Sequence, residues 1–257
     1  METAKQGRAA KAALVTGGAR GIGRKCALHL AEKGFSIALV DVLVPEMSAV
    51  KQQIERAGGK AICLEADVAD HRRAKDVVKE AHAAFGRIDV LLNNAGRPNP
   101  KGILEINEEE FDRTIAINLK SCFNYIQPIV PIMRGLGAGR VICMSSLNAY
   151  SGGVTAAVSR FSYAAAKAGI LGLVRALAKE LGPEIHINAI CPGLIATEVG
   201  QNGVINSRGA EIAENGIALK RIGCTDDVAQ LVGFLATSEP CFITGQALVV
   251  DGFQFQM

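Results

Sequence analysis

An apolar run passes directly into a glycine-rich turn in the stretch Ala12-Ala13-Leu14-Val15-Thr16-Gly17-Gly18-Ala19-Arg20-Gly21-Ile22-Gly23. An apolar run of this kind is typical of a strand covered on both faces of a sheet. The glycines let the backbone turn tightly and approach a ligand closely. The helix expected from Gly21 offers free N–H groups and a positive dipole end to a phosphate. The spacing differs from the common GxGxxG dinucleotide fingerprint, so the stretch alone also fits a simple strand–helix connection.

The same alternation of strand and helix patterns continues to the end of the chain. Further strands are predicted at Ser36–Asp41, Ala61–Ala66, Val90–Asn93, Arg140–Ser146, His186–Cys191 and Ala247–Asp251. Helices are predicted over Gly21–Lys33, Pro45–Ala57, Asp70–Phe85, Glu108–Met133, Phe161–Leu181 and Asp226–Ala236. This order predicts an α/β fold, a doubly wound and mostly parallel sheet with helices on both faces. Because no linker interrupts it, we expect one domain over residues 11–257 after a polar tail at residues 1–10.

Composition narrows the classes of function. The chain has 257 residues and a formal charge of +3, and no run of Lys and Arg exceeds two residues, so no nucleic-acid partner is expected. Charges, Gly or Pro break every apolar stretch before about 18 residues, so no membrane partner is expected. The seven cysteines are far apart and form no CxxC pair, which predicts free thiols, no metal site and a cytoplasmic location.

The strand ends carry the polar residues expected at a ligand site, because α/β sheets bind ligands beyond the carboxyl ends of their strands. Asp41 ends the second strand at the position where the adenosine ribose is bound. Its carboxylate accepts hydrogen bonds from the ribose diol and repels a 2′-phosphate, which predicts NAD rather than NADP. Arg20 acts in the opposite direction, since a guanidinium can pair with a 2′-phosphate. Asp41 carries more weight because it lies at the strand tip itself.

Two further strand ends leave alternatives open. Asp67 and Val68 follow the third strand, and Asp67 either caps the helix that begins near Asp70 or contacts the adenine amino group. The fourth strand runs into the segment Asn93-Asn94-Ala95-Gly96. These residues suit a strand end that closes over a flat ring, although an ordinary Asn-rich turn has the same composition.

Tyr163 and Lys167 lie four residues apart in an expected helix, so their side chains share one face. A nearby positive charge favours the phenolate form of a tyrosine. The pair therefore predicts an acid/base group that works near neutral pH. The five-residue pattern is weak alone, because the same spacing occurs by chance in many helices.

Taken in order with Asn118, Ser145-Ser146 and Pro192-Gly193, these motifs resemble those of the short-chain dehydrogenase/reductase family. The resemblance covers about residue 10 to 252 and implies a Rossmann-like, single-domain oxidoreductase that transfers a hydride between NAD(P) and a secondary alcohol or ketone. It also implies a homo-oligomer, a homotetramer, with a substrate lid near residues 196–218.

The resemblance assigns the catalytic roles. Tyr163 is expected to be the general acid/base, while Lys167 favours its phenolate and holds the nicotinamide ribose. Ser146, rather than its neighbour Ser145, is expected to stabilise the reacting oxygen. Asn118 is expected to hold a water that relays protons to Lys167. The cofactor is expected to contact Gly17, Arg20, Gly21, Ile22, Gly23, Asp41, Asp67, Val68, Asn94, Ala95, Gly96, Tyr163, Lys167, Pro192, Gly193, Ile195 and Thr197.

Two departures from the family pattern stand out. Ser146 and Tyr163 are a few residues further apart than usual, and the extra residues fall within Asn148–Ser162, where they are expected to reshape the substrate pocket. Phe253 stands where the family commonly has a glycine. Phe253 and Phe255 are expected to pack either against a neighbouring subunit or within their own.

The substrate is the least constrained part. Arg97, Asn99, Lys101, Asn148 and Tyr150 are expected around the pocket and suit a polar substrate such as a polyol, sugar or hydroxy acid. One alternative is an NADPH-dependent 3-oxoacyl carrier-protein reductase, which needs basic residues at the pocket mouth. A non-catalytic dinucleotide-binding regulator is the alternative of another class, and the complete catalytic set argues against it.

Overall fold

The computed structural model describes residues 10–153, 159–198 and 203–254. Seven of the strands in these residues form one parallel sheet in the order β3-β2-β1-β4-β5-β6-β9. They are β1 (Ala12–Thr16), β2 (Ser36–Asp41), β3 (Ala61–Glu65), β4 (Val90–Asn93), β5 (Gly139–Met144), β6 (Ile185–Pro192) and β9 (Ala247–Val250). A second small sheet pairs β7 (Ile195–Ala196) with β8 (Gly223–Cys224).

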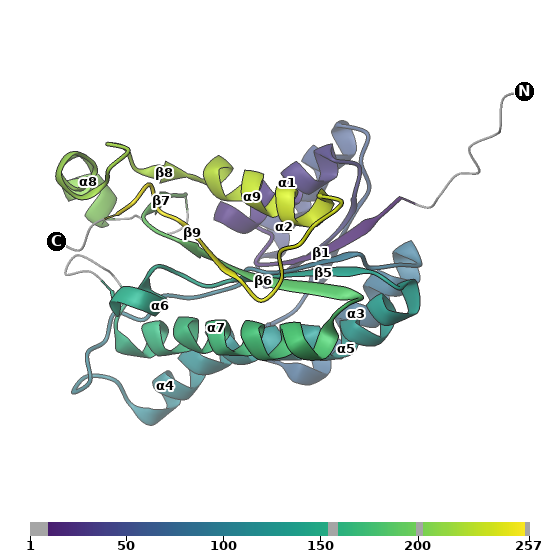
Figure 1. The fold of residues 1–257 in the computed structure, drawn as a ribbon, viewed down its shortest axis with the longest axis horizontal. Coiled ribbons are helices and arrows are strands. Elements are labelled where there is room, and N and C mark those ends of the chain that lie inside the picture. Colours follow the sequence, from purple (N-terminus) through teal and green to yellow (C-terminus); the bar gives the residue numbers. More distant parts are fainter. Residues whose placement is uncertain (1–9, 154–158, 199–202, 255–257) are drawn as a thin grey trace, which may run out of the picture.

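Helices cover both faces of the large sheet, as predicted (Figure 1). One face carries α1 (Gly21–Glu32), α2 (Val44–Arg56) and α9 (Thr225–Thr237), and the other carries α3 (His71–Phe85), α5 (Ser121–Leu136) and α7 (Phe161–Leu181). The remaining helices are α4 (Glu108–Ile115), α6 (Asn148–Ser151) and α8 (Gly203–Gly216). The strands are apolar because both of their faces are buried, and the doubly wound fold is confirmed.

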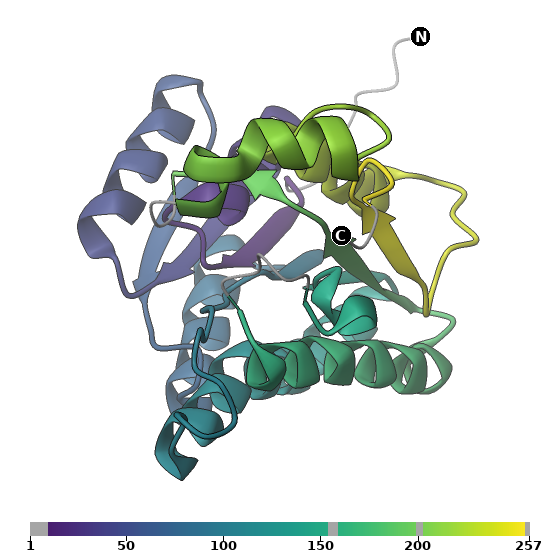
Figure 2. The same ribbon diagram turned by 90° about the vertical axis from the view of Figure 1, so that its left-hand side faces the viewer.

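The strand order reverses at β1, which pairs with β2 on one side and with β4 on the other. The chain leaves these neighbouring strands in opposite directions, and ligands of open α/β sheets bind at this point. Figure 2 looks onto the end of the molecule where α6 and α8 lie. Because β1 and β4 are neighbours in the sheet, the turns that follow them lie close together, although almost 80 residues separate Thr16 from Asn94.

The predicted helix Glu108–Met133 is interrupted by a π-helical segment, Ala116–Lys120 (η1), between α4 and α5. Asn118 lies in this segment, is 1% exposed and donates from Nδ2 to the carbonyl of Thr114 at 3.0 Å. A side chain that bonds the carbonyl four residues earlier competes with the regular helical hydrogen bond. Wide turns of this kind occur frequently at functional sites.

Other element boundaries in the structure differ from the predicted ones where the local sequence pattern is weak. β5 ends at Met144, so Ser145 and Ser146 lie just beyond the strand rather than in it. The region expected as a lid, 196–218, contains α8, although residues 199–202 lie outside the described residues. Residues 1–9 of the expected tail, residues 154–158 of the expected insertion and Phe255 also lie outside them.

Among the described helices, α7 is long and apolar enough to cross a membrane by length and composition alone. Its side chains Ile170, Leu171 and Val174 are instead buried in the core beneath the sheet. The core helix of a globular protein passes the same composition test. We therefore interpret α7 as a core helix, and it is the element that carries Tyr163 and Lys167.

Candidate functional site

The glycine-rich turn is closed by contacts with the turn after β4. Gly17 has φ +66°, and a Cβ there would lie 2.8 Å from the Asn94 side chain and 2.9 Å from Cα of Ala95. A Cβ on Gly23 would lie 2.0 Å from the Gly17 carbonyl. Asn94 Nδ2 donates to the carbonyls of Thr16 at 3.0 Å and Gly17 at 3.2 Å. Larger residues at these two glycine positions would separate the two turns.

Thr16 is a residue of this site that the sequence analysis did not identify as functional. Its hydroxyl is buried and accepts the N–H groups of Asn94 at 3.0 Å and Ala95 at 3.1 Å. A polar residue at the end of an apolar strand was the available signal. Thr16 fixes the position of the Asn94-Ala95-Gly96 segment relative to the glycine-rich turn.

Asp41 is held against the glycine-rich turn by its own carboxylate. One oxygen accepts the N–H groups of Val42 at 2.8 Å and Leu43 at 3.2 Å, and the other accepts the N–H of Ala19 at 3.2 Å. Arg20, the residue that follows Ala19, is exposed. The structure therefore places the carboxylate and the exposed guanidinium, the two groups expected to act in opposite directions on cofactor choice, on adjoining segments.

The capping alternative for Asp67 is wrong, because Asp70 is the residue that caps α3, accepting the N–H of Arg73 at 3.0 Å. Asp67 instead accepts the N–H of Ala69 at 3.0 Å and forms an ion pair with Arg113 at 2.5 Å. Partial burial raises the pKa of Asp67, but the Ala69 hydrogen bond and the Arg113 guanidinium outweigh it and hold the pKa below its usual value. This side chain is therefore a carboxylate at neutral pH.

Val68, next to Asp67, is fixed through its carbonyl, which accepts a hydrogen bond from Asn124 Nδ2 at 2.8 Å. Asn124 belongs to α5 and is buried. The contact connects the segment after β3 to α5. It therefore fixes Asp67-Val68, the segment expected to face the adenine.

The structure brings Tyr163, Lys167, Gly96 and Asn118 together. Lys167 is 2% exposed, and its Nζ lies 5.5 Å from the centroid of the Tyr163 ring. Its Nζ also donates to the carbonyl of Met144 at 2.8 Å. A Cβ on Gly96 would lie 3.4 Å from this Nζ and 3.0 Å from Oδ1 of Asn118. A buried ammonium next to a phenol is the arrangement that proton transfer by tyrosine requires.

The Asn118 amide joins the end of β4 to α4. Its Oδ1 accepts the N–H of Arg97 at 3.0 Å, while Nδ2 donates to the carbonyls of Arg97 at 2.9 Å and Thr114 at 3.0 Å. Both amide protons are therefore in use. A water held by Asn118 must donate to one of its oxygens, either Oδ1 or the backbone carbonyl.

The two neighbouring serines have different surroundings. Ser145 is buried and donates its hydroxyl to the carbonyl of Lys167 at 2.8 Å, which ties α7 to the end of β5. Ser146 is half-buried, and its oxygen accepts the N–H of Asn148 at 3.2 Å. In that bond Ser146 is the acceptor, so its proton remains available for a substrate oxygen.

The segment after β6 is also fixed. The carbonyl of Pro192 accepts the N–H of Leu147 at 2.9 Å, and a Cβ on Gly193 would lie 2.6 Å from Cβ of Asp251. Ile195 lies in β7 and pairs with Gly223, and Thr197 follows directly. These residues follow β6 at the carboxyl edge of the sheet, the same edge at which the turns after β1 and β4 meet.

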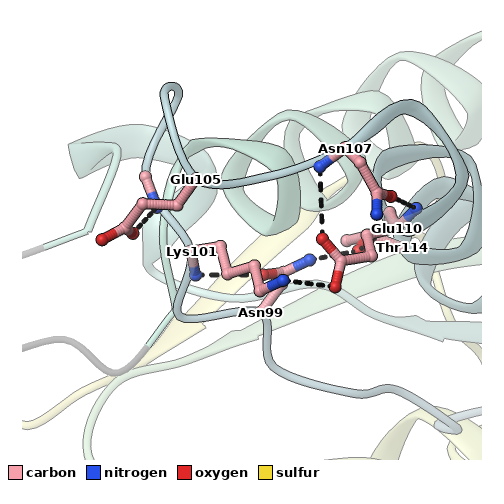
Figure 3. Close-up of polar contacts among 7 residues, drawn as sticks. Asn99, Lys101, Glu105, Asn107, Glu110 and Thr114 are labelled. Carbon is pink, nitrogen blue, oxygen red and sulfur yellow. Dashed lines mark hydrogen bonds and ion pairs between the residues drawn. The ribbon is translucent and has the colours of Figure 1, made fainter.

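Two of the polar residues expected around the substrate, Asn99 and Lys101, contact helix α4 instead (Figure 3). Asn99 Nδ2 donates to Thr114 Oγ1 at 2.8 Å, and Lys101 forms an ion pair with Glu110. Asn107 and Glu110 make a reciprocal capping box at the start of α4. The side chains of Asn99 and Lys101 therefore brace the loop against α4, which does not support their expected role as substrate-binding groups.

The first turn of α1 fits an anionic group. Gly21 N donates at 3.0 Å to a carboxylate oxygen of Glu198, which lies beyond β7. Diphosphates bind helix N-termini through the same free N–H groups and the positive end of the helix dipole. The residues present therefore fit the diphosphate of a dinucleotide.

Comparisons with known proteins agree with this geometry. A family model described as Enoyl-(Acyl carrier protein) reductase matches residues 17–252. The chain is 37% identical to the 3-oxoacyl-[acyl-carrier-protein] reductase FabG of Staphylococcus epidermidis, over 94% of this chain and 98% of that protein. It is also 37% identical to the short-chain type dehydrogenase/reductase y4mP of Sinorhizobium fredii, over 94% and 96% of the two chains.

A solved structure, a putative short-chain alcohol dehydrogenase from Sinorhizobium meliloti, superposes with a TM-score of 0.87 at 32% identity and covers 94% of this chain and 95% of its own. The sequence motifs, the reversal of strand order at β1 and these similarities agree. The chain therefore belongs to the short-chain dehydrogenase/reductase family of nicotinamide-dependent oxidoreductases.

Proposed function

We propose that this protein interconverts a secondary alcohol and a ketone, with Tyr163 as the general acid/base. The observation that carries the proposal is the buried ammonium of Lys167, 5.5 Å from the Tyr163 ring and packed beside Gly96 and Asn118. Proton transfer by a positioned side chain typically contributes about 10²–10⁴-fold to a rate.

Each catalytic residue has a specific task. In the oxidation direction the Tyr163 phenolate takes the hydroxyl proton of the substrate, and in the reduction direction the phenol returns it. Ser146 donates a hydrogen bond to the same substrate oxygen and stabilises its developing charge. Lys167 stabilises the phenolate, and Asn118 holds the water through which a proton reaches Lys167.

The nicotinamide cofactor, when bound, supplies or accepts the hydride. The residues that would hold it are those of the glycine-rich turn, Asp41, Asp67-Val68, Asn94 to Gly96, Tyr163, Lys167 and the segment from Pro192 to Thr197. Asp41 supports NAD as the preferred form, because a carboxylate at the end of β2 can accept hydrogen bonds from the ribose diol and repels a 2′-phosphate.

Lys167→Met should change how the oxidation rate depends on pH. In the wild type the rate should rise with pH to a plateau as the Tyr163 phenolate forms. Without the ammonium the phenolate is less favourable, so the rise should move to higher pH or turnover should disappear. The measurement is kcat for alcohol oxidation between pH 6 and pH 10.

Lys179→Met is the matched control, because Lys179 lies exposed on the same helix and its replacement removes the same charge. It should leave the profile in place. An unchanged profile for Lys167→Met would refute the coupling between Lys167 and Tyr163.

The substrate proposed first is a polar alcohol or ketone such as a polyol, sugar or hydroxy acid. Because Asn99 and Lys101 are engaged with α4, Arg97, Asn148 and Tyr150 are the remaining polar candidates. The second candidate is an NADPH-dependent 3-oxoacyl carrier-protein reductase, which is supported by the similarity to 3-oxoacyl-[acyl-carrier-protein] reductases.

A substrate panel with both cofactors separates these candidates. The panel contains polyols, sugars and hydroxy acids in the oxidation direction, and acetoacetyl-CoA as a small 3-oxoacyl thioester in the reduction direction. Turnover is read by the absorbance of the reduced nicotinamide. Efficient reduction of the thioester with NADPH supports the carrier-protein reductase, and turnover of no compound with either cofactor refutes both.

The proposed assembly is a cytoplasmic homotetramer, with a substrate lid at residues 196–218. Phe253 is 70% exposed and has φ +58°, in the region that favours glycine. An exposed aromatic side chain held in such a conformation suits packing against a neighbouring subunit. Phe253→Gly should therefore leave the subunit folded but shift the sedimentation coefficient to that of a smaller oligomer. An unchanged sedimentation coefficient would remove Phe253 from the interface.

A further inference from the structure

The carboxylate of Glu198 reaches from the segment after β7 to the first turn of α1. Its Oε1 accepts the N–H of Gly21 at 3.0 Å and lies 3.5 Å from Nη1 of Arg24. Arg24 is itself anchored, because its Nη2 donates to Oε1 of Gln53 in α2 at 3.3 Å. The contact thus joins two parts of the chain 177 positions apart.

Within the described residues, α1 has no cap of its own. The side chain of its N-cap residue, Arg20, makes no capping hydrogen bond, and its first turn contains no acidic residue. Free N–H groups at a helix N-terminus attract an anion, and the helix dipole adds to that attraction. Glu198 supplies this anion from a distant part of the chain.

Glu198 is charged at neutral pH. Partial burial raises the pKa of its carboxyl group. Hydrogen bonds from backbone N–H groups, including that of Gly21, and the nearby Arg24 guanidinium lower this pKa by more than burial raises it. The net result is a pKa below the usual value for glutamate. The group at Gly21 is therefore a carboxylate, the same kind of ligand as a phosphate oxygen.

The proposed function places the cofactor diphosphate at the same N–H group, because dinucleotides bind with the diphosphate at the N-terminus of the helix after β1. One donor cannot serve both anions, and their like charges repel at this distance. We infer that Glu198 is an internal competitor of the cofactor diphosphate, and that it determines cofactor affinity by occupying Gly21 in the free protein. This inference rests on the proposed function.

Displacement of Glu198 requires little rearrangement. β7, which ends two residues earlier at Ala196, is held by its pairing with β8. The Glu198 side chain is 52% exposed. Rotation about its own side-chain bonds moves the carboxylate into water, where it is solvated, while the backbone of β7 keeps its place.

The test is the Kd of NADH, measured by titration calorimetry for wild type, Glu198→Gln and Glu198→Ala. Glu198→Gln removes the charge but keeps an oxygen that can accept from Gly21, whereas Glu198→Ala removes both. We expect Kd to fall about 3- to 30-fold in Glu198→Ala, and by less in Glu198→Gln, as the competing anion is lost. Inorganic pyrophosphate, titrated separately, should show the same order.

The control is Glu32→Gln, which removes the same charge at the opposite end of α1, where the side chain is 68% exposed. It should leave both constants unchanged, and circular dichroism of each variant should match that of the wild type. An unchanged or higher Kd in both Glu198 variants overturns the inference. If the wild type and both variants bind no dinucleotide, the proposed function fails, while the pyrophosphate series still decides the role of Glu198.

Discussion

Tyr163→Phe should lower kcat about 10²- to 10⁴-fold while the protein keeps its fold and its affinity for the cofactor. The change removes one oxygen atom from a side chain that is half-buried in α7. Without the hydroxyl, no group at this position can take the substrate proton, and the hydrogen bond to the reacting oxygen is also lost. The measurements are single-turnover and steady-state rates, together with the Kd of the cofactor.

The matched control is Tyr125→Phe, which makes the same chemical change in a residue of α5. Tyr125 is fully buried on the same side of the sheet, and within the described residues its hydroxyl has no hydrogen-bond partner. Its loss should leave kcat unchanged. If Tyr163→Phe keeps more than a tenth of the wild-type kcat, Tyr163 is not the general acid/base.

The sequence was sufficient to predict the seven strands of the large sheet, because an apolar run is a local signal, whereas the two-residue strands β7 and β8 were not predicted. A strand covered on both faces needs an apolar run, and the chain contains seven of them. The turn after β1 needs glycine at Gly17 and Gly23, since a Cβ would meet the neighbouring turn. The carboxyl ends of parallel strands meet at one edge, so residues far apart in sequence had to gather there.

The contacts that complete the site have no local signal. Lys167 bonds the carbonyl of Met144, a group that every residue type carries, so the sequence does not distinguish it. The bond from Ser145 to the Lys167 backbone depends on how α7 packs against the end of β5. Glu198 at Gly21 is a contact between distant segments.

The interruption at Asn118 escaped prediction for a related reason. The pattern over Glu108–Met133 suits one continuous helix, and a single polar residue within it does not predict a π-helical turn. Asn118 forms that turn because its amide is shared between Thr114, one turn earlier, and the backbone of Arg97 after β4. Only the second contact, which is made across the fold, explains why this residue is buried.

Asp41→Ala should erase most of the preference for NAD over NADP. The wild-type carboxylate accepts hydrogen bonds from the ribose diol and repels a 2′-phosphate, which together amount to about 2–4 kcal/mol, or roughly 30- to 1000-fold. Removing it weakens NAD and relieves the clash with NADP. The measurement is kcat/KM for both cofactors at one ionic strength, in wild type and variant.

Asp41→Asn separates the charge from the local structure. Asp41 accepts the N–H groups of Ala19, Val42 and Leu43, so the alanine variant also loosens the glycine-rich turn. Asparagine keeps the acceptor oxygen that bonds Val42 and Leu43 but loses the charge that repels the 2′-phosphate. A gain for NADP that is shared by both variants is therefore electrostatic. The Ala19 contact is lost in both variants, because the asparagine Nδ2 is a donor, so a loss for both cofactors in the alanine variant alone reports the missing contacts with Val42 and Leu43.

Arg20 decides whether the preference only disappears or reverses. It is exposed and adjoins Ala19, whose N–H the Asp41 carboxylate holds, so its guanidinium can meet a 2′-phosphate once the carboxylate is gone. Adding Arg20→Gln to Asp41→Ala should then remove the gain for NADP while changing NAD little. A wild type that already prefers NADP would show that Arg20 outweighs Asp41, and would favour the 3-oxoacyl carrier-protein reductase over a dehydrogenase of polar alcohols.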